Sequence, residues 1–149
     1  VVTMDDMFAY AESFDGEIGL WDVSNVHGFR RTFMEAFSFN QDISNWNIKT
    51  GSGISMEEMF MDARSFNQDI SSWDVNGVSV MTRMFHQSYS DQVGKMSINQ
   101  DLSSWDVVNV TQCLAFAQIG HIRINNDPLP LLTEWVKEKP NFTNCESIS

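Results

Sequence analysis

Apolar and polar positions recur along this chain with a period of about 25 residues. The stretch FNQDISSWDV at 66–75 returns with few changes at 39–48 and 98–107. A period between about 20 and 50 residues is typical of proteins that stack one structural unit upon the next. Four tryptophans mark the period, namely Trp21, Trp46, Trp73 and Trp105. We therefore expect four full units and part of a fifth.

Polar insertions account for the places where the spacing exceeds 25 residues. Two extra residues lie in Lys49–Gly53, and seven lie within His86–Ser97. Outside them the apolar columns continue, as in Phe14, Phe39, Phe66 and Ile98. Another column holds small residues, namely Ala11, Ala36, Ala63, Ser88 and Gly120. Because backbones approach closely only where side chains are small, this column predicts tightly stacked units.

Each unit carries the pattern of a short helix and of a short strand. Within Ser55–Ala63, apolar residues stand at i, i+3, i+4 and i+7, the spacing of one helical face. The stretches 73–78 and 105–110 alternate Trp or Val with polar residues, which predicts strands. Elements this short are unstable alone, because helix nucleation is unfavourable and a strand needs partners. Stacked units would supply the missing apolar cover.

The sequence therefore predicts an α/β fold, a right-handed solenoid of strand-helix coils of about 25 residues closed by a C-terminal capping helix. Residues 1–117 would form the repeat solenoid. Residues 118–149 would cap it within the same domain, through a helix over Pro128–Pro140. Since the chain begins inside the pattern, we treat it as a mature or trimmed piece from which a leader or further repeats are removed.

The recurring NQD motif has a structural and a chemical interpretation. Its asparagines can bond to backbone groups where each unit turns, so we interpret the motif as a corner. Its aspartates stack in one column, which raises the alternative of a bound Ca²⁺. One carboxylate per unit gathers too few oxygens around one point, so solvated or turn-bonding aspartates are favoured. The residues concerned are Asn40, Asn67 and Asn99, and Asp42, Asp69 and Asp101.

The charge of the chain narrows the class of partner. Its 20 acidic and 9 basic residues give a net charge of −11, and the basic residues are scattered. A nucleic-acid partner is therefore not expected, because phosphate backbones require a positive stripe. The chain also lacks a run of about 18 apolar residues, so no membrane insertion of this segment is expected.

The stretch MFMDARSFNQDISSWDVNGV, from Met59 to Val78, resembles the bacterial surface protein 26-residue repeat family, the BspA-like repeats of mycoplasma lipoproteins and other surface proteins. The resemblance covers roughly residues 4–117. It implies a leucine-rich-repeat-like solenoid on cell-surface or secreted proteins, with roles in adhesion and binding and no defined chemistry. The first unit departs from the motif, with FDGEIGLWDVSNV in place of the Asn-Gln-Asp corner.

The two cysteines and two glycosylation triplets favour an extracellular or cell-surface location. A disulfide between Cys113 and Cys145 could staple the tail to the last repeat; the alternative is two unconnected thiols, one of them buried. Asn109 and Asn141 each begin a glycosylation acceptor triplet. Together with the surface-type repeat, these features indicate a secreted glycoprotein.

Residues with catalytic or metal-binding patterns are not found. His27, His86 and His121 fall in unrelated columns, and none has a second ligand at metal-binding spacing. No phosphate-binding loop or nucleophile elbow is present. We therefore expect no enzyme activity, no metal and no cofactor.

Two kinds of binding remain open. A polar, acidic column on the expected strands would suit a protein partner, a component of a host or neighbouring cell surface, or association within a larger assembly. The residues of this column are Asp22, Asn25, Asp74, Asn76 and Asp106. The alternative is a glycan-binding, lectin-like module, which would need the periodic tryptophans to be exposed so that they stack on sugar rings.

Overall fold

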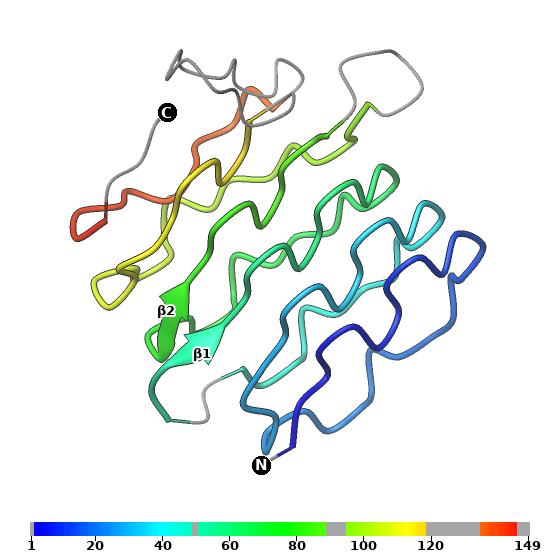
Figure 1. Ribbon diagram of the computed structural model, residues 1–149, viewed down its shortest axis with the longest axis horizontal. Coiled ribbons are helices and arrows are strands. Elements are labelled where there is room, and N and C mark those ends of the chain that lie inside the picture. The colour runs from blue at the N-terminus through cyan, green and yellow to red at the C-terminus, as the bar shows by residue number, and fades with distance from the viewer. Residues whose placement is uncertain (1, 49–50, 89–94, 119–134, 146–149) are drawn as a thin grey trace.

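The computed structural model is a stack of coils that succeed one another from the N-terminal to the C-terminal end (Figure 1). It describes residues 2–48, 51–88, 95–118 and 135–145. Two strands are present in these ranges, β1 (Ile54–Ser55) and β2 (Val78–Val80). They pair in parallel, with Ile54 opposite Val78. Isolated parallel bridges, such as that between Val2 and Val26, join other neighbouring coils.

The predicted α/β solenoid of strand-helix coils with a capping helix is wrong. The described part of the chain contains no helix and only these two short strands. In the expected helix at Ser55–Ala63, each turn instead closes with a bond to the third residue back, as from the N–H of Met59 to the carbonyl of Met56 and from Ala63 to Phe60. The segment is therefore a chain of β-turns.

Hydrogen bonds between coils explain why turns replace the helix. The N–H groups of Glu58, Phe60 and Asp62 donate to carbonyls of Thr82, Met84 and His86 in the next coil, at 2.8 to 2.9 Å. An α-helix would need those same N–H groups for its own carbonyls. Stacking thus takes alternate donors out of the segment and leaves only the tighter turns inside it.

The turn chain places non-glycine residues in the left-handed backbone region. Five of them occupy one column, at φ between 52° and 59°, namely Asp6, Arg31, Glu58, Arg83 and Ala115. This region is uncommon for residues other than glycine. Since residues as different as Asp, Arg and Ala adopt it at the same place in each coil, the stacking imposes the conformation.

The strands also lie elsewhere than expected. The predicted strands at 73–78 and 105–110 are turns and irregular segments, and β2 begins only at Val78. Residues Trp73 and Val78 close turns onto carbonyls three residues back. The alternation of apolar and polar residues therefore indicates which side chains are buried. It does not indicate strands that pair in an extended ladder.

The C-terminal segment completes the last coil in place of a cap helix. Of the expected helix over Pro128–Pro140, residues 128–134 lie outside the described ranges, and residues 135–145 contain no helix. The N–H groups of Val136 and Lys137 donate to the Asn99 side chain, both at 3.0 Å. Trp135 is buried, and its indole N–H donates to the carbonyl of Gln100. Residues 135–145 therefore take the place that the NQD segment has in earlier coils.

Aromatic side chains stack through the core at coil spacing. The indole of Trp73 lies between those of Trp46 and Trp105, with 6.4 Å between ring centres on either side. Each indole N–H donates to a carbonyl of the preceding coil, as from Trp73 to Ile43 at 2.9 Å. The phenylalanines of neighbouring columns are also buried, namely Phe33, Phe39, Phe60, Phe66 and Phe85. The core is one continuous column of rings because each coil buries the face of the next.

Candidate functional site

Stacked asparagines hold the corner of each coil. The side-chain oxygen of Asn40 accepts the backbone N–H of Asn67, and that of Asn67 accepts the N–H of Asn99, each at 2.9 Å. In the first coil Asp15 takes the same role toward Asn40. Gln100 adds a bond from its amide to the Asn67 oxygen. We call Asn40, Asn67 and Asn99 the asparagine ladder. Their bonds agree with the interpretation of the motif as a structural corner.

Replacing Asn67 tests the asparagine ladder. We expect Asn67→Ala to lower the free energy of unfolding by about 1–2 kcal/mol, because the N–H of Asn99 and the amide of Gln100 lose their acceptor. Asn67→Asp keeps an oxygen there, as Asp15 does naturally, and should cost less than half as much. Urea denaturation of both variants measures the difference. Equal losses would contradict the role of the oxygen.

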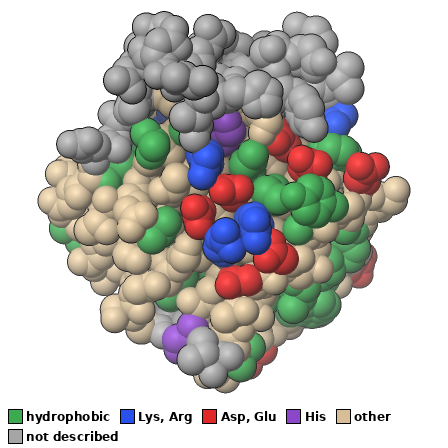
Figure 2. All heavy atoms as spheres, in the orientation of Figure 1, with side chains coloured by type: hydrophobic (Ala, Val, Ile, Leu, Met, Phe, Trp, Pro, Cys, Tyr) green, Lys and Arg blue, Asp and Glu red, His purple; other side chains and the backbone are tan. Residues whose placement is uncertain are grey.

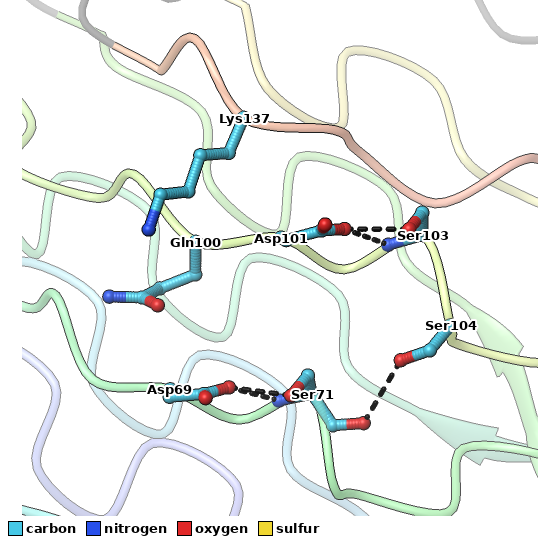
Figure 3. A pocket seen from close by; sticks show the side chains of 7 residues that line it. All are labelled: Asp69, Ser71, Gln100, Asp101, Ser103, Ser104 and Lys137. Atoms are coloured by element: carbon cyan, nitrogen blue, oxygen red, sulfur yellow. Dashed lines mark hydrogen bonds between the residues drawn. The ribbon is translucent and has the colours of Figure 1, made fainter.

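The aspartates of the NQD motif bond within their own turns. The carboxylates of Asp69 and Asp101 accept the backbone N–H and the hydroxyl of Ser71 and Ser103, respectively (Figure 3). These bonds, the side-chain ones first, lower the pKa of both carboxyls below the ordinary value. Asp42 bonds to the N–H of Ser44 in the same way. The carboxylates are therefore turn-forming groups, as the favoured interpretation expects.

Shallow polar hollows lie between neighbouring coils on this side. One of about 260 Å³ is lined by the two Asp-Ser turns, Gln100, Ser104 and Lys137 (Figure 3). A second, of about 250 Å³, repeats the arrangement one coil earlier, around Asp42 and Asp69. Hydroxyl, amide and carboxylate groups line both hollows. They offer hydrogen bonds to a polar partner without an enclosed, apolar pocket of the kind that small molecules usually occupy.

The structure brings three residues of the predicted acidic column together. The amide of Asn76 donates to the carboxylate of Asp106, in the next coil, at 3.0 Å. Asp74 lies in the same turn as Asn76 and accepts its backbone N–H. Asn109 extends the group through a 2.8 Å bond from its amide to the carbonyl of Asn76. We call Asp74, Asn76, Asp106 and Asn109 the amide-carboxylate row.

The other predicted residues of the column lie in the first coil. The Asp22 carboxylate accepts the hydroxyl and the backbone N–H of Ser24, and these bonds, the hydroxyl bond first, lower the pKa of this carboxyl below its ordinary value. Asn25 is exposed, and its carbonyl lies 2.9 Å from the ring of His27. None of the predicted residues lies in β1 or β2, so the expected placement of this column on strands is wrong.

The remaining predicted site residues are the two cysteines and the two glycosylation acceptors. Cys113 and Cys145 are joined by a disulfide, with 6.0 Å between their Cα atoms. Asn141 and Asn109 are both exposed, although the amide of Asn109 is engaged in the amide-carboxylate row. The disulfide therefore ties the segment at 135–145 to the last coil.

A set of charged residues that sequence analysis missed crosses the face shown in Figure 2. Arg31 pairs with Asp6 at 2.7 Å, Arg30 with Glu57 at 2.9 Å, and Arg83 with Glu58 at 3.3 Å. The sign alternates from coil to coil, so basic side chains lie between acidic ones in the centre of this face (Figure 2). We call Asp5, Asp6, Arg30, Arg31, Glu57, Glu58 and Arg83 the charge ladder. Its signal in the sequence is an adjacent like-charged pair whose sign reverses at the repeat period through the first three coils, followed by Arg83 alone in the fourth.

Glu35 gives the stability of the protein a pH dependence. Burial, followed by the charges of Asp62 and Glu12, raises the pKa of its carboxyl above the ordinary 4.5. The folded state thus favours the protonated form, so stability falls as the pH rises through the unfolded and then the folded pKa. We expect Glu35→Gln to raise the melting temperature by about 1–2 °C at pH 7 and to have little effect below pH 4. Calorimetry across this pH range measures it. Glu17→Gln, at an exposed position, serves as control, and an equal gain there would contradict the assignment.

Groups suited to metal binding or membrane crossing are not seen in the described ranges. In those ranges no three His, Cys, Asp or Glu side chains gather in a way that could hold a metal ion. His27 and His86 belong to different parts of the fold, and His121 lies outside the described residues. Nor does any described segment form a helix long and apolar enough to span a bilayer.

Comparison with known proteins gives one family. The model of the family described as "Mycoplasma protein of unknown function, DUF285" matches residues 1–97 and 50–118 of the chain. The two matches overlap and together cover the first four coils and the front of the fifth. No curated protein and no solved structure matches the chain.

Proposed function

The chain belongs to the family described as Mycoplasma protein of unknown function, DUF285, and from that premise we propose that it is a non-enzymatic binding module on a cell surface or in the extracellular space. Within this family we assign it to the BspA-like type of surface repeat. Its partner would be a protein or a component of a host or neighbouring cell surface, met singly or within a larger assembly.

The observation that carries the proposal is the regular spacing of exposed polar groups along a rigid stack. The amide-carboxylate row spans two coils and is fixed by direct bonds between them. The Asp-Ser turns repeat in three coils, with their hollows between. Since the side chains are already oriented, a partner would bind without a large cost for ordering them. An extended surface of this kind suits a macromolecule better than a small substrate.

The disulfide supports an extracellular location. Disulfides persist in oxidising compartments and are rare in the cytosol. Here one bond ties down the whole segment at 135–145, which also holds the exposed acceptor Asn141. The extracellular location is therefore part of the proposed function.

The glycan-binding alternative receives less support. Trp46, Trp73 and Trp105 are at most 4% exposed, and their N–H groups are bonded to backbone carbonyls. A sugar ring cannot stack on them. Trp21 is 45% exposed and is the described member of the column that a sugar could reach.

Charge reversal in the amide-carboxylate row tests the proposed surface. We expect Asp74→Lys with Asp106→Lys to weaken adhesion of the purified chain to intact cells at least tenfold. The natural row is acidic and suits basic or amide-rich partners, whereas the substituted row is basic and would repel a basic partner. Glu12→Lys with Glu17→Lys is the control with the same change of charge, because both glutamates are exposed and lie outside the amide-carboxylate row and the hollows. Flow cytometry with labelled protein gives the binding curve. Unchanged adhesion of the first variant would rule this row out, and a shift in Trp21 emission on addition of sugars would favour the glycan alternative.

A further inference from the structure

The charge ladder runs along the side of the stack and not at either end of it. It lies in the centre of the face shown in Figure 2, with basic side chains between acidic ones. The ladder takes one row from each of four coils, namely Asp5 and Asp6, Arg30 and Arg31, Glu57 and Glu58, and Arg83. A further coil at either end of the stack would lengthen this face and leave it uncovered.

The ion pairs within the chain leave part of each charge open to solvent. Arg30 pairs with Glu57 through Nε, and the two side chains are 42% and 28% exposed. Asp6, which pairs with Arg31, is 47% exposed. A guanidinium has five N–H donors in a planar fork, so an exposed arginine can bind a second carboxylate beside the first. The ladder can therefore pair with charges on another molecule without breaking its own ion pairs.

The order of charge along the ladder is complementary to itself. From the first coil to the fourth, the rows are acidic, basic, acidic and basic. Suppose that a second copy faces the ladder with its coils in the reverse order. The second coil of each copy then faces the third coil of the other, so that Arg30 meets Glu57 and Arg31 meets Glu58. The first coil faces the fourth, so that Asp6 meets Arg83. A two-fold axis parallel to the coils, between the second and the third, produces this arrangement.

The rows also distinguish this register from its neighbours. Stacked parallel segments lie about 4.8 Å apart, so a slip by one coil is small in distance. It nevertheless places acidic rows opposite acidic rows and basic opposite basic, which is unfavourable. Two copies that face each other with their coils in the same order would also oppose like charges in each row. The register centred between the second and third coils is the one that pairs all four rows.

From the exposure, order and register of these charges we propose that the charge ladder is a docking surface for a second copy of the chain, in a symmetric dimer whose two stacks face each other with their coils in opposite order. The net charge of −11 opposes the approach of two copies. At about 0.15 M salt, however, exposed charges more than about 8 Å apart are largely screened, whereas rows in contact are screened less. The dimer uses other residues than the amide-carboxylate row, so it does not depend on the proposed function.

Charge exchange between two coils tests the dimer. Arg30→Glu with Arg31→Glu makes the second and third coils both acidic, and Glu57→Lys with Glu58→Lys makes both basic. Each variant alone should dimerise at least tenfold more weakly than the natural chain, because like rows then face each other. An equal mixture of the two variants should form a heterodimer, since each row of one variant faces a row of opposite charge on the other. Sedimentation velocity over a range of concentrations measures all three samples.

A matched control separates the ladder from net charge. Asp74→Lys with Asp106→Lys changes the net charge by the same amount as Glu57→Lys with Glu58→Lys, but in the amide-carboxylate row, and should not weaken dimerisation. Thermal melts check that the variants are folded, because both exchanges also remove ion pairs within the chain. If a reversed variant does not fold, the milder Glu57→Gln with Glu58→Gln must still weaken the dimer.

Three results would overturn the proposal. The first is a natural chain that stays monomeric at about 0.15 M salt up to its highest soluble concentration. The second is a dimer of either folded variant that is as strong as that of the natural chain. The third is an equal mixture of the folded variants that does not associate.

Discussion

Replacing Trp73 by alanine is expected to lower the free energy of unfolding by about 3–5 kcal/mol, the usual cost of truncating a buried aromatic side chain. Trp73 is 3% exposed and contacts rings on both sides, with Trp46 and Trp105 each 6.4 Å away between ring centres. Its loss also leaves the carbonyl of Ile43 without the indole donor. Because a small protein is stable by about 5–15 kcal/mol, the variant should be close to unfolding at room temperature.

Trp21→Ala is the matched control, since Trp21 holds the same position in the first coil but has a coil on one side only. We expect it to cost less than half as much as Trp73→Ala. Urea denaturation followed by circular dichroism compares the two. Equal costs would mean that stacking from both sides is not what stabilises the column.

Removing the disulfide is the second change with a large expected effect. Cys113 and Cys145 are separated by 32 residues, and opening a loop of this size should cost about 3–4 kcal/mol through the entropy of the unfolded chain. In the Cys113→Ala, Cys145→Ala variant we expect the segment at 135–145 to detach first. Trp135 would then leave its contact with Phe85, and its indole would become accessible to quenchers.

The measurement compares denaturant midpoints of the oxidised protein with and without a reductant. The double variant is the control, because a reductant should not shift its midpoint. If reduction leaves both the midpoint of the natural chain and the quenching of its tryptophans unchanged, the bond does not hold this segment in place.

The pattern of buried positions could be predicted from the sequence, whereas the backbone that buries them could not. Met56, Met59, Phe60 and Ala63 are all fully buried, as the spacing of one helical face predicts. Yet that spacing fits any chain that turns back at intervals of three and four residues. Bonds to the next coil decide between a helix and a series of β-turns, and a local pattern carries no information about them.

The site shows a similar division. The asparagine ladder could be predicted from asparagines that recur at one period, because the side-chain oxygen of an asparagine in a turn commonly accepts a backbone N–H. The charge ladder was overlooked because each charged pair, such as Arg30 and Arg31, is unremarkable within its own unit. The spacing of Leu131, Leu132, Trp135 and Val136 predicts a helix over Pro128–Pro140, and the sequence at 135–145, WVKEKPNFTNC, contains no NQD motif. Only the bonds from Val136 and Lys137 to Asn99 reveal its equivalence.

The column of left-handed residues has a practical consequence for protein engineering. Asp, Arg, Glu, Arg and Ala all adopt the same φ there, so the position makes no demand on the side chain beyond what its neighbours across the stack require. Ala115 is buried, whereas Asp6, Arg31, Glu58 and Arg83 are at least partly exposed. A designer could therefore vary the side chains of these four positions, one in each coil, and so give each variant its own surface without changing the core.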